Sequence, residues 1–169
     1  MNRLSHSKRV AAAAIASVLV VALSVAIAQA ATTKKITLKS QAVSSLNADV
    51  LAAPTGRTLY RLKPETTRHV LCTTQCLQFW KALTVKSKKT TVKLPAGIHG
   101  KISFLSRGKN KFQVALKGWP LYTFVGDTAK GQGNGQNIKS FGGTWLSLTV
   151  KKSAANNTPT MTNPAPYGY

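Results

Sequence analysis

Two cysteines separated by three residues are the sharpest chemical feature of this 169-residue chain. Cys72 and Cys76 are its only cysteines, and His69 lies three residues before the first. In an exported protein, cysteines this close favour a disulfide. A regular helix would hold the two side chains too far apart, so we expect a bent turn there. Two alternatives stay open: a redox-active pair, or a metal site that includes His69.

Acidic residues are few and scattered. The chain has only Asp49, Glu65 and Asp127, together with three histidines. General acid–base catalysis needs a positioned pair of titratable groups, and neither a nucleophile elbow nor an H-E-x-x-H zinc motif is present. We therefore expect a protein that is not an enzyme and uses no cofactor. Glu65 and Asp127 each follow a predicted strand, where a carboxylate accepts hydrogen bonds from turn amides or pairs with a cation; ligand or cation binding is the alternative.

An internal repeat indicates how the strands and turns that position these residues are organised. Gly-Arg-Thr-Leu-Tyr-Arg-Leu at 56–62 returns as Gly-Trp-Pro-Leu-Tyr-Thr-Phe at 118–124. Trp-Lys-Ala-Leu-Thr-Val at 80–85 returns as Trp-Leu-Ser-Leu-Thr-Val at 145–150. The offsets are 62 and 65 residues, so order and spacing are both kept. Such self-similarity marks a structural unit, and we predict one small domain (49–152) of two related halves, about 49–85 and 101–150.

Short apolar runs between turn residues predict a mostly β domain built from antiparallel hairpins. Predicted turns contain Pro-Thr-Gly at 54–56, Arg-Gly-Lys-Asn at 107–110 and Lys-Gly-Trp-Pro at 117–120. Residues 77–83 predict at most a short helix after the cysteines. The glycine-rich segment 131–136 satisfies neither nucleotide-binding glycine pattern, so we predict a flexible surface loop.

Four aromatic residues are predicted to anchor the core. Trp80 and Trp145 close the two halves, and Tyr60 and Tyr122 occupy equivalent strand positions. Each tyrosine shares a strand face with the residue two positions later. A buried tryptophan contributes a few kcal/mol, so such anchors matter in a small domain. The alternative is a surface stripe that stacks sugars or bases.

The first thirty residues have the pattern of an export signal. A positive start precedes an apolar run over 10–28, and Ala-Gln-Ala then precedes Ala31. A retained membrane anchor is the alternative, because the run is long enough to cross a bilayer as a helix. Composition predicts a basic flexible spacer at 31–48 and a disordered tail at 153–169.

The chain carries a net charge of +21, with 24 lysines and arginines. Such a charge keeps a secreted protein soluble and attracts polyanions, and salt weakens that attraction. Combined with export, it favours anionic cell-wall polymers or lipid head groups as partners. The sequence does not favour nucleic acid as a partner, because no recognised nucleic-acid module is present, and nothing in the sequence indicates a protein partner.

Several of these residues resemble the bacterial secreted-repeat family, which comprises lipoproteins and secreted proteins with a Yx(FWY)xxD motif. Tyr122, Phe124 and Asp127 match that motif, whereas the first copy keeps Tyr60 but has Leu62 and Glu65 at the other positions. The Cys72–Cys76 spacing followed by Trp80, and Gly-Gly-Thr-Trp at 142–145, also fit. The resemblance implies an exported, often envelope-associated bacterial protein of unestablished molecular function, and it supplies no catalytic residue.

Two classes of function follow from the sequence. The first hypothesis is a secreted, non-enzymatic, strongly basic protein associated with the cell envelope through anionic polymers. The second is an extracytoplasmic redox or electron-transfer accessory protein that uses Cys72 and Cys76.

Overall fold

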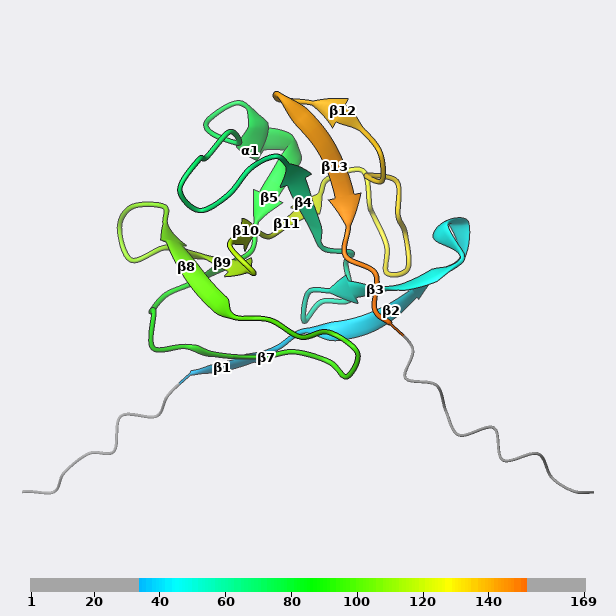
Figure 1. Cartoon of the computed structure of the whole chain (residues 1–169), viewed down its shortest axis with the longest axis horizontal. Coiled ribbons are helices and arrows are strands. Elements are labelled where there is room, and N and C mark those ends of the chain that lie inside the picture. The colour runs from blue at the N-terminus through cyan, green and yellow to red at the C-terminus, as the bar shows by residue number, and fades with distance from the viewer. Residues whose placement is uncertain (1–33, 152–169) are drawn as a thin grey trace, which may run out of the picture. The chain divides into compact units, whose positions relative to one another are not determined.

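The computed structural model describes residues 34–151 (Figure 1). The predicted signal segment or anchor at 1–30 and the predicted tail at 153–169 lie outside the described residues. Between residues 34 and 151, no helix has the length and apolar character needed to cross a membrane. The described part is mostly β, with nearly all strand pairs antiparallel and one short helix after the cysteines, which confirms the predicted fold class.

The segment predicted as a flexible spacer instead belongs to the fold, so that prediction is wrong for most of its length. β1 (Lys35–Thr37) pairs in parallel with β7 (Thr91–Lys93), and β2 (Lys39–Val43) pairs antiparallel with β3 (Ala48–Ala52) after the 3-10 turn η1 (Ser44–Leu46). Leu38 and Val43 are each 1% exposed. Single apolar residues at these positions hold the strands on the core, while the intervening lysines face solvent.

A four-stranded sheet holds the hairpin predicted around the turn at 107–110. Its strands are β6 (Thr84–Val85), β8 (Ile102–Ser106), β9 (Phe112–Leu116) and β10 (Trp119–Pro120). The turn predicted at 117–120 is shorter than expected, because Trp119 and Pro120 already form a strand of this sheet and Tyr122–Phe124 belongs to the other large sheet. The turn between β9 and β10 has positive φ at Lys117 (54°) and Gly118 (80°). Two such residues make the type I′ turn that matches the twist of a hairpin.

A five-stranded sheet has the order β12 (Lys139–Ser140), β13 (Gly143–Ser147), β4 (Tyr60–Lys63), β11 (Tyr122–Phe124), β5 (Trp80–Ala82). Helix α1 (Cys76–Phe79) is a single turn, so the helical segment predicted for 77–83 ends at Phe79. Trp80 already belongs to β5, where it pairs with Phe124 of β11. Pairing with β11 therefore determines where the helix ends.

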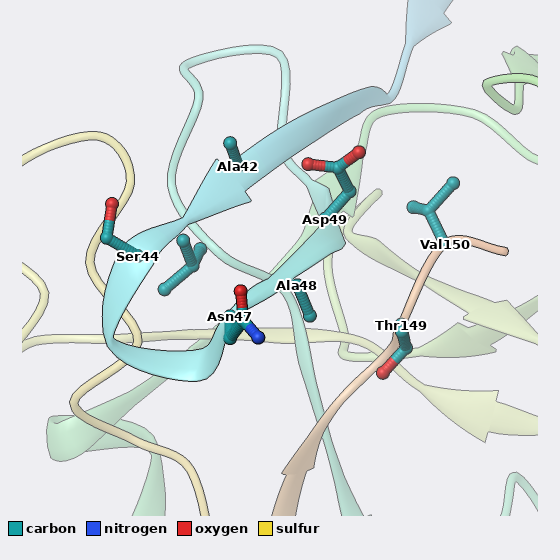
Figure 2. Close-up of a pocket in the computed structure, with 8 residues that line it drawn as sticks. Ala42, Ser44, Asn47, Ala48, Asp49, Thr149 and Val150 are labelled. Atoms are coloured by element: carbon teal, nitrogen blue, oxygen red, sulfur yellow. The ribbon is translucent and has the colours of Figure 1, made fainter. Parts of the chain in front are cut away.

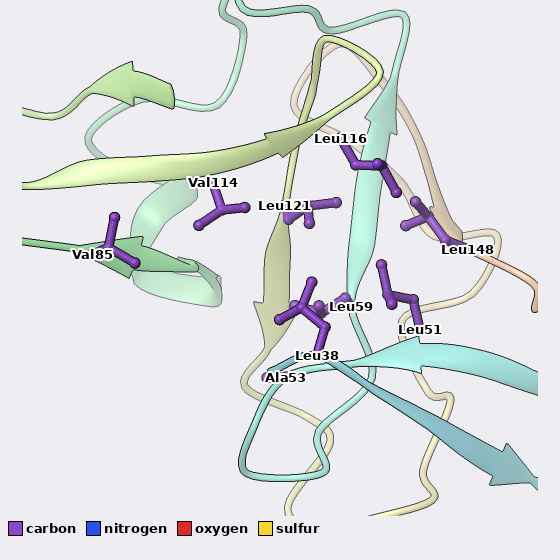
Figure 3. Packing of buried hydrophobic residues seen from close by; sticks show 9 residues of the cluster. All are labelled: Leu38, Leu51, Ala53, Leu59, Val85, Val114, Leu116, Leu121 and Leu148. Atoms are coloured by element: carbon purple, nitrogen blue, oxygen red, sulfur yellow. The ribbon is translucent and has the colours of Figure 1, made fainter. Parts of the chain in front are cut away.

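The core consists of two hydrophobic clusters. One is aliphatic and fills the space between the strands around β3, β4 and β9 (Figure 3); its buried members are Leu38, Leu51, Ala53, Leu59, Val85, Val114, Leu116, Leu121 and Leu148. The other is aromatic and lies against the five-stranded sheet; its members are Tyr60, Leu62, Cys72, Cys76, Trp80, Tyr122 and Trp145.

Candidate functional site

The two copies of the repeat meet at a pair of tyrosines in the middle of the five-stranded sheet. Tyr60 of β4 pairs directly with Tyr122 of β11. On the outer side of β4, Trp145 pairs with Leu62, and on the outer side of β11, Trp80 pairs with Phe124. Each half therefore places its tryptophan strand beside the tyrosine strand of the other half.

The four aromatic anchors form one buried stack rather than a solvent-facing stripe. Trp80 and Trp145 lie face to face, with ring centroids 3.7 Å apart and planes 5° from parallel. Tyr60 meets Trp80 edge-on at 5.4 Å, and Tyr122 meets Trp145 edge-on at 5.2 Å. All four are at most 1% exposed. The two edge-to-face pairs have the geometry that adds to the stabilisation from burial.

Each tyrosine hydroxyl donates to an acid from the opposite half. Tyr60 Oη donates to Asp127 Oδ2 at 2.7 Å, and Tyr122 Oη donates to Glu65 Oε1 at 3.0 Å. Glu65 follows Tyr60 at the same interval at which Asp127 follows Tyr122. Both carboxylates are buried, being 1% and 0% exposed. The two motif copies thus complete each other.

Each carboxylate also accepts a hydrogen bond from the backbone of a loop. The backbone N–H of Asn134 donates to Asp127 Oδ1 at 2.9 Å, and that of Cys72 donates to Glu65 Oε1 at 3.0 Å. Both donors lie seven residues after their acid. The role expected for acids beyond a strand, accepting amide hydrogen bonds, is what these contacts provide.

Arg107 extends this network, and sequence reasoning placed it only in a turn. Its guanidinium donates to Tyr122 Oη at 2.7 Å, to Gln113 Oε1 at 2.7 Å and to the Cys72 carbonyl at 3.0 Å. Glu65 Oε2 is buried and has no hydrogen-bond partner among the described residues. Arg107 has no counterpart in the first half of the repeat, so the repeat gave no signal for it.

The network keeps its hydroxyls neutral. Burial, followed by the nearby Asp127, raises the pKa of Tyr60 well above its usual value. Burial and then Glu65 raise the pKa of Tyr122 in the same way, against the opposing charge of Arg107. Burial also raises the pKa of Asp127, and the hydrogen bond from Tyr60 opposes that shift. These groups are closed off from solvent and, apart from Glu65 Oε2, hydrogen-bonded within the network, so they join the two halves of the repeat.

The glycine-rich segment 131–136 is not a free surface loop, so that prediction is wrong for its centre. Gly133 and Gly135 are buried. A Cβ atom at Gly135 would lie 2.8 Å from Trp80 Cη2 and 2.9 Å from Tyr60 Cζ. The Gly135 N–H donates to Tyr60 Oη at 3.2 Å. Glycine is needed here because the backbone itself covers the aromatic stack.

The cysteines form the predicted disulfide. Cys72 and Cys76 are bonded, with Cα atoms 5.2 Å apart, and α1 begins only at the second of them, as the expected bent turn requires. Both are buried, at 0% and 3% exposure. His69 is exposed, and within residues 34–151 no group of three or more His, Cys, Asp or Glu side chains is arranged to hold a metal ion. The disulfide also removes the thiolates that the metal alternative required.

The surface of residues 34–151 also contains hollows, among them the following three. One of about 440 Å³ is lined by small residues of β2 and β3 and by the segment after β13, with Asp49 as its one charged side chain (Figure 2). The second, of about 360 Å³, contains Arg61, and the third, of about 470 Å³, contains Arg57. We call the last two the Arg61 pocket and the Arg57 pocket.

These features define a mostly β repeat domain whose two halves share one aromatic core. Residues 105–149 match the family described as a secreted repeat of unknown function, which confirms the resemblance noted from the sequence. The matched residues include Tyr122, Phe124, Asp127 and Trp145, and the description suggests an extracellular location. No curated protein and no solved structure matches the chain.

Proposed function

We propose that this protein is a secreted, non-catalytic, basic protein that binds anionic polymers of the cell envelope. The observation that supports this proposal most directly is the burial of two of its three acidic residues. Of the three in the chain, Glu65 and Asp127 are buried and accept hydrogen bonds internally, so only Asp49 opposes the surface lysines and arginines. The surface is therefore more basic than the composition alone indicates.

A surface of this kind attracts a polyanion through many weak contacts. Each cation that neutralises an anionic group releases a condensed counterion, and the affinity falls as salt rises. Long-range attraction also speeds encounter with a charged wall or membrane. Neither effect requires a catalytic group, and the titratable residues of the aromatic network are already engaged with each other.

Fractionation of envelopes at increasing ionic strength tests the proposal. The secreted protein should remain with the envelope at low salt and be released by sodium chloride, but not by a neutral osmolyte of equal osmolarity. The same release should occur from isolated walls if wall polymers are the partner, and from lipid vesicles if head groups are. Retention that high salt leaves unchanged would refute an electrostatic partner.

A further inference from the structure

The Arg61 and Arg57 pockets are the same hollow built twice by the repeat. Leu116, Lys117 and Trp119 in the first correspond, at an offset of 62, to Pro54, Thr55 and Arg57 in the second. Ser147, Leu148 and Thr149 correspond in the same way, at an offset of 65, to Ala82, Leu83 and Thr84. Arg61 itself takes the place of Thr123. Because each pocket takes residues from both halves, the exchange of strands creates both.

The side chains of the two pockets have diverged toward different chemistry. The Arg61 pocket gathers three permanent cations, Arg61, Lys117 and Lys151, together with His99, and no carboxylate lines it. The Arg57 pocket contains Arg57 and Lys81, and Arg57 donates to the Thr128 carbonyl at 3.4 Å. Only the Arg61 pocket adds a tryptophan.

Arg61 is held in a way that leaves its donors available. Its guanidinium carbon lies 4.1 Å from the centre of the Trp119 ring, in a cation–π stack. A guanidinium over an aromatic face is attracted by the ring itself, so its N–H groups remain available to an acceptor. Burial lowers the pKa of Arg61, and no nearby carboxylate among the described residues opposes that effect. The half-buried cation therefore lacks an internal counter-charge.

We propose that the Arg61 pocket binds a phosphodiester group of an anionic polymer or lipid, with Arg61 as the stacked fork and Lys117 and Lys151 as flanking cations. This proposal rests on the polyanion binding proposed above and assigns it a site. Phosphate oxygens accept several donors at once and suit an arginine fork bidentately. The Ser147 and Thr149 residues of β13 and its extension add hydroxyl groups to the lining. Apolar lining from Ile98, Leu116 and Leu148 suits the carbon atoms that flank a phosphodiester.

The duplicated pocket supplies a matched control. The site variant is Arg61→Gln/Lys117→Gln, and the control variant is Arg57→Gln/Lys81→Gln. Each pair contains one half-buried arginine and one exposed lysine, so both variants lose the same charge from similar positions. The secreted protein and both variants are titrated with poly(glycerol phosphate), with polyglutamate, and with vesicles containing phosphatidylglycerol, at one moderate ionic strength.

The site variant should bind poly(glycerol phosphate) or the vesicles at least roughly tenfold more weakly than the control variant, because charge-assisted hydrogen bonds are lost. Loss on the soluble polymer alone identifies a wall-type source, and loss on vesicles alone identifies a lipid head group; both support the site. Equal weakening of the two variants overturns the pocket and leaves the proposed function standing. Absence of binding by the unmodified protein to every polyanion overturns both.

Two further measurements test whether the Arg61 pocket binds phosphate. Lys117→Gln/Lys151→Gln changes only exposed residues and retains the Arg61–Trp119 stack, so it tests the pocket even if Arg61→Gln unfolds. It too should weaken phosphate-polymer binding more than the control variant does. Equally strong, equally pocket-dependent binding of polyglutamate would overturn the assignment to phosphate.

Discussion

Tyr60 and Asp127 come from opposite halves of the repeat, yet the tyrosine hydroxyl donates to the aspartate carboxylate at 2.7 Å inside the core. Tyr122 and Glu65 repeat the relationship in the other direction at 3.0 Å. The tyrosine and the acid of one motif copy therefore never satisfy each other. Because an unpaired buried carboxylate is costly, neither copy has a complete core without its partner.

This crossing predicts that the halves fold only together. Cutting the chain between Pro95 and Ala96 separates Tyr60, Glu65 and Trp80 from the strands that complete them. Fragments 31–95 and 96–152 should each lack a cooperative thermal transition and the near-ultraviolet circular dichroism of the stacked tryptophans. Mixing them should restore both signals. A cooperative transition in either fragment alone would contradict the prediction.

The buried tyrosines predict a loss of stability in alkali. In the unfolded chain both hydroxyls ionise near their ordinary pKa of 10.0, whereas burial and the adjacent carboxylates raise the pKa of each in the folded protein. Above pH 10 the folded state therefore holds protons that the unfolded state has lost, and stability falls as pH rises. The slope contributed by each tyrosine is about 1.4 kcal/mol per pH unit.

Denaturant melts across this range measure that slope. Tyr60→Phe and Tyr122→Phe should each remove from the slope the contribution of about one proton. Each should also lower stability by about 1–3 kcal/mol at neutral pH, because a buried acceptor loses its donor. The tyrosinate absorbance of Tyr60 and Tyr122 should not appear in the folded protein and should rise when the protein unfolds. Titration of all four tyrosines in the folded state would show that the hydroxyls are accessible.

Asp127 predicts a pH effect at the acidic end. Burial raises the pKa of its carboxyl above the ordinary 3.8, so between that value and the raised one the folded state keeps a proton that the unfolded state has lost. Within this window the contribution of Asp127 makes stability fall as pH rises. Asp127→Asn should remove that part of the slope. Asp49→Asn, which removes a carboxylate outside the network, is the control, and an equal change in both variants would refute the assignment.

Turn residues and strand period predicted the hairpins because those signals are local. The proline and glycine of Pro-Thr-Gly at 54–56 and the glycine at 118 mark their turns by the φ angles they allow, and alternating residues mark the faces of the strands. The repeat likewise identified the four aromatic anchors by their equivalent positions. All of this information lies within a few residues of each element.

What the sequence could not reveal depends on distant partners. β1 and β2 were predicted as a spacer because lysine and serine dominate their composition, and only packing shows that Leu38 and Val43 join the core. Arg107 sits in a predicted turn, and its three acceptors are brought to it by three other segments. The crossing of the motif copies is also a property of strand order, which two similar halves do not determine.

Gly135 illustrates the same dependence and gives the sharpest test of the packing. Its backbone covers Trp80 and Tyr60, so a methyl group there must displace one of the rings. Gly135→Ala should cost about 1–3 kcal/mol through overpacking and alter the near-ultraviolet signal of the stack. Gly108→Ala is the matched control: nothing lies within 4 Å of an added Cβ, although its φ of +77° gives that variant a cost of its own, about 1 kcal/mol. An unchanged tryptophan signal in Gly135→Ala, with a cost no larger than that of Gly108→Ala, would show that the loop does not press on the aromatic core.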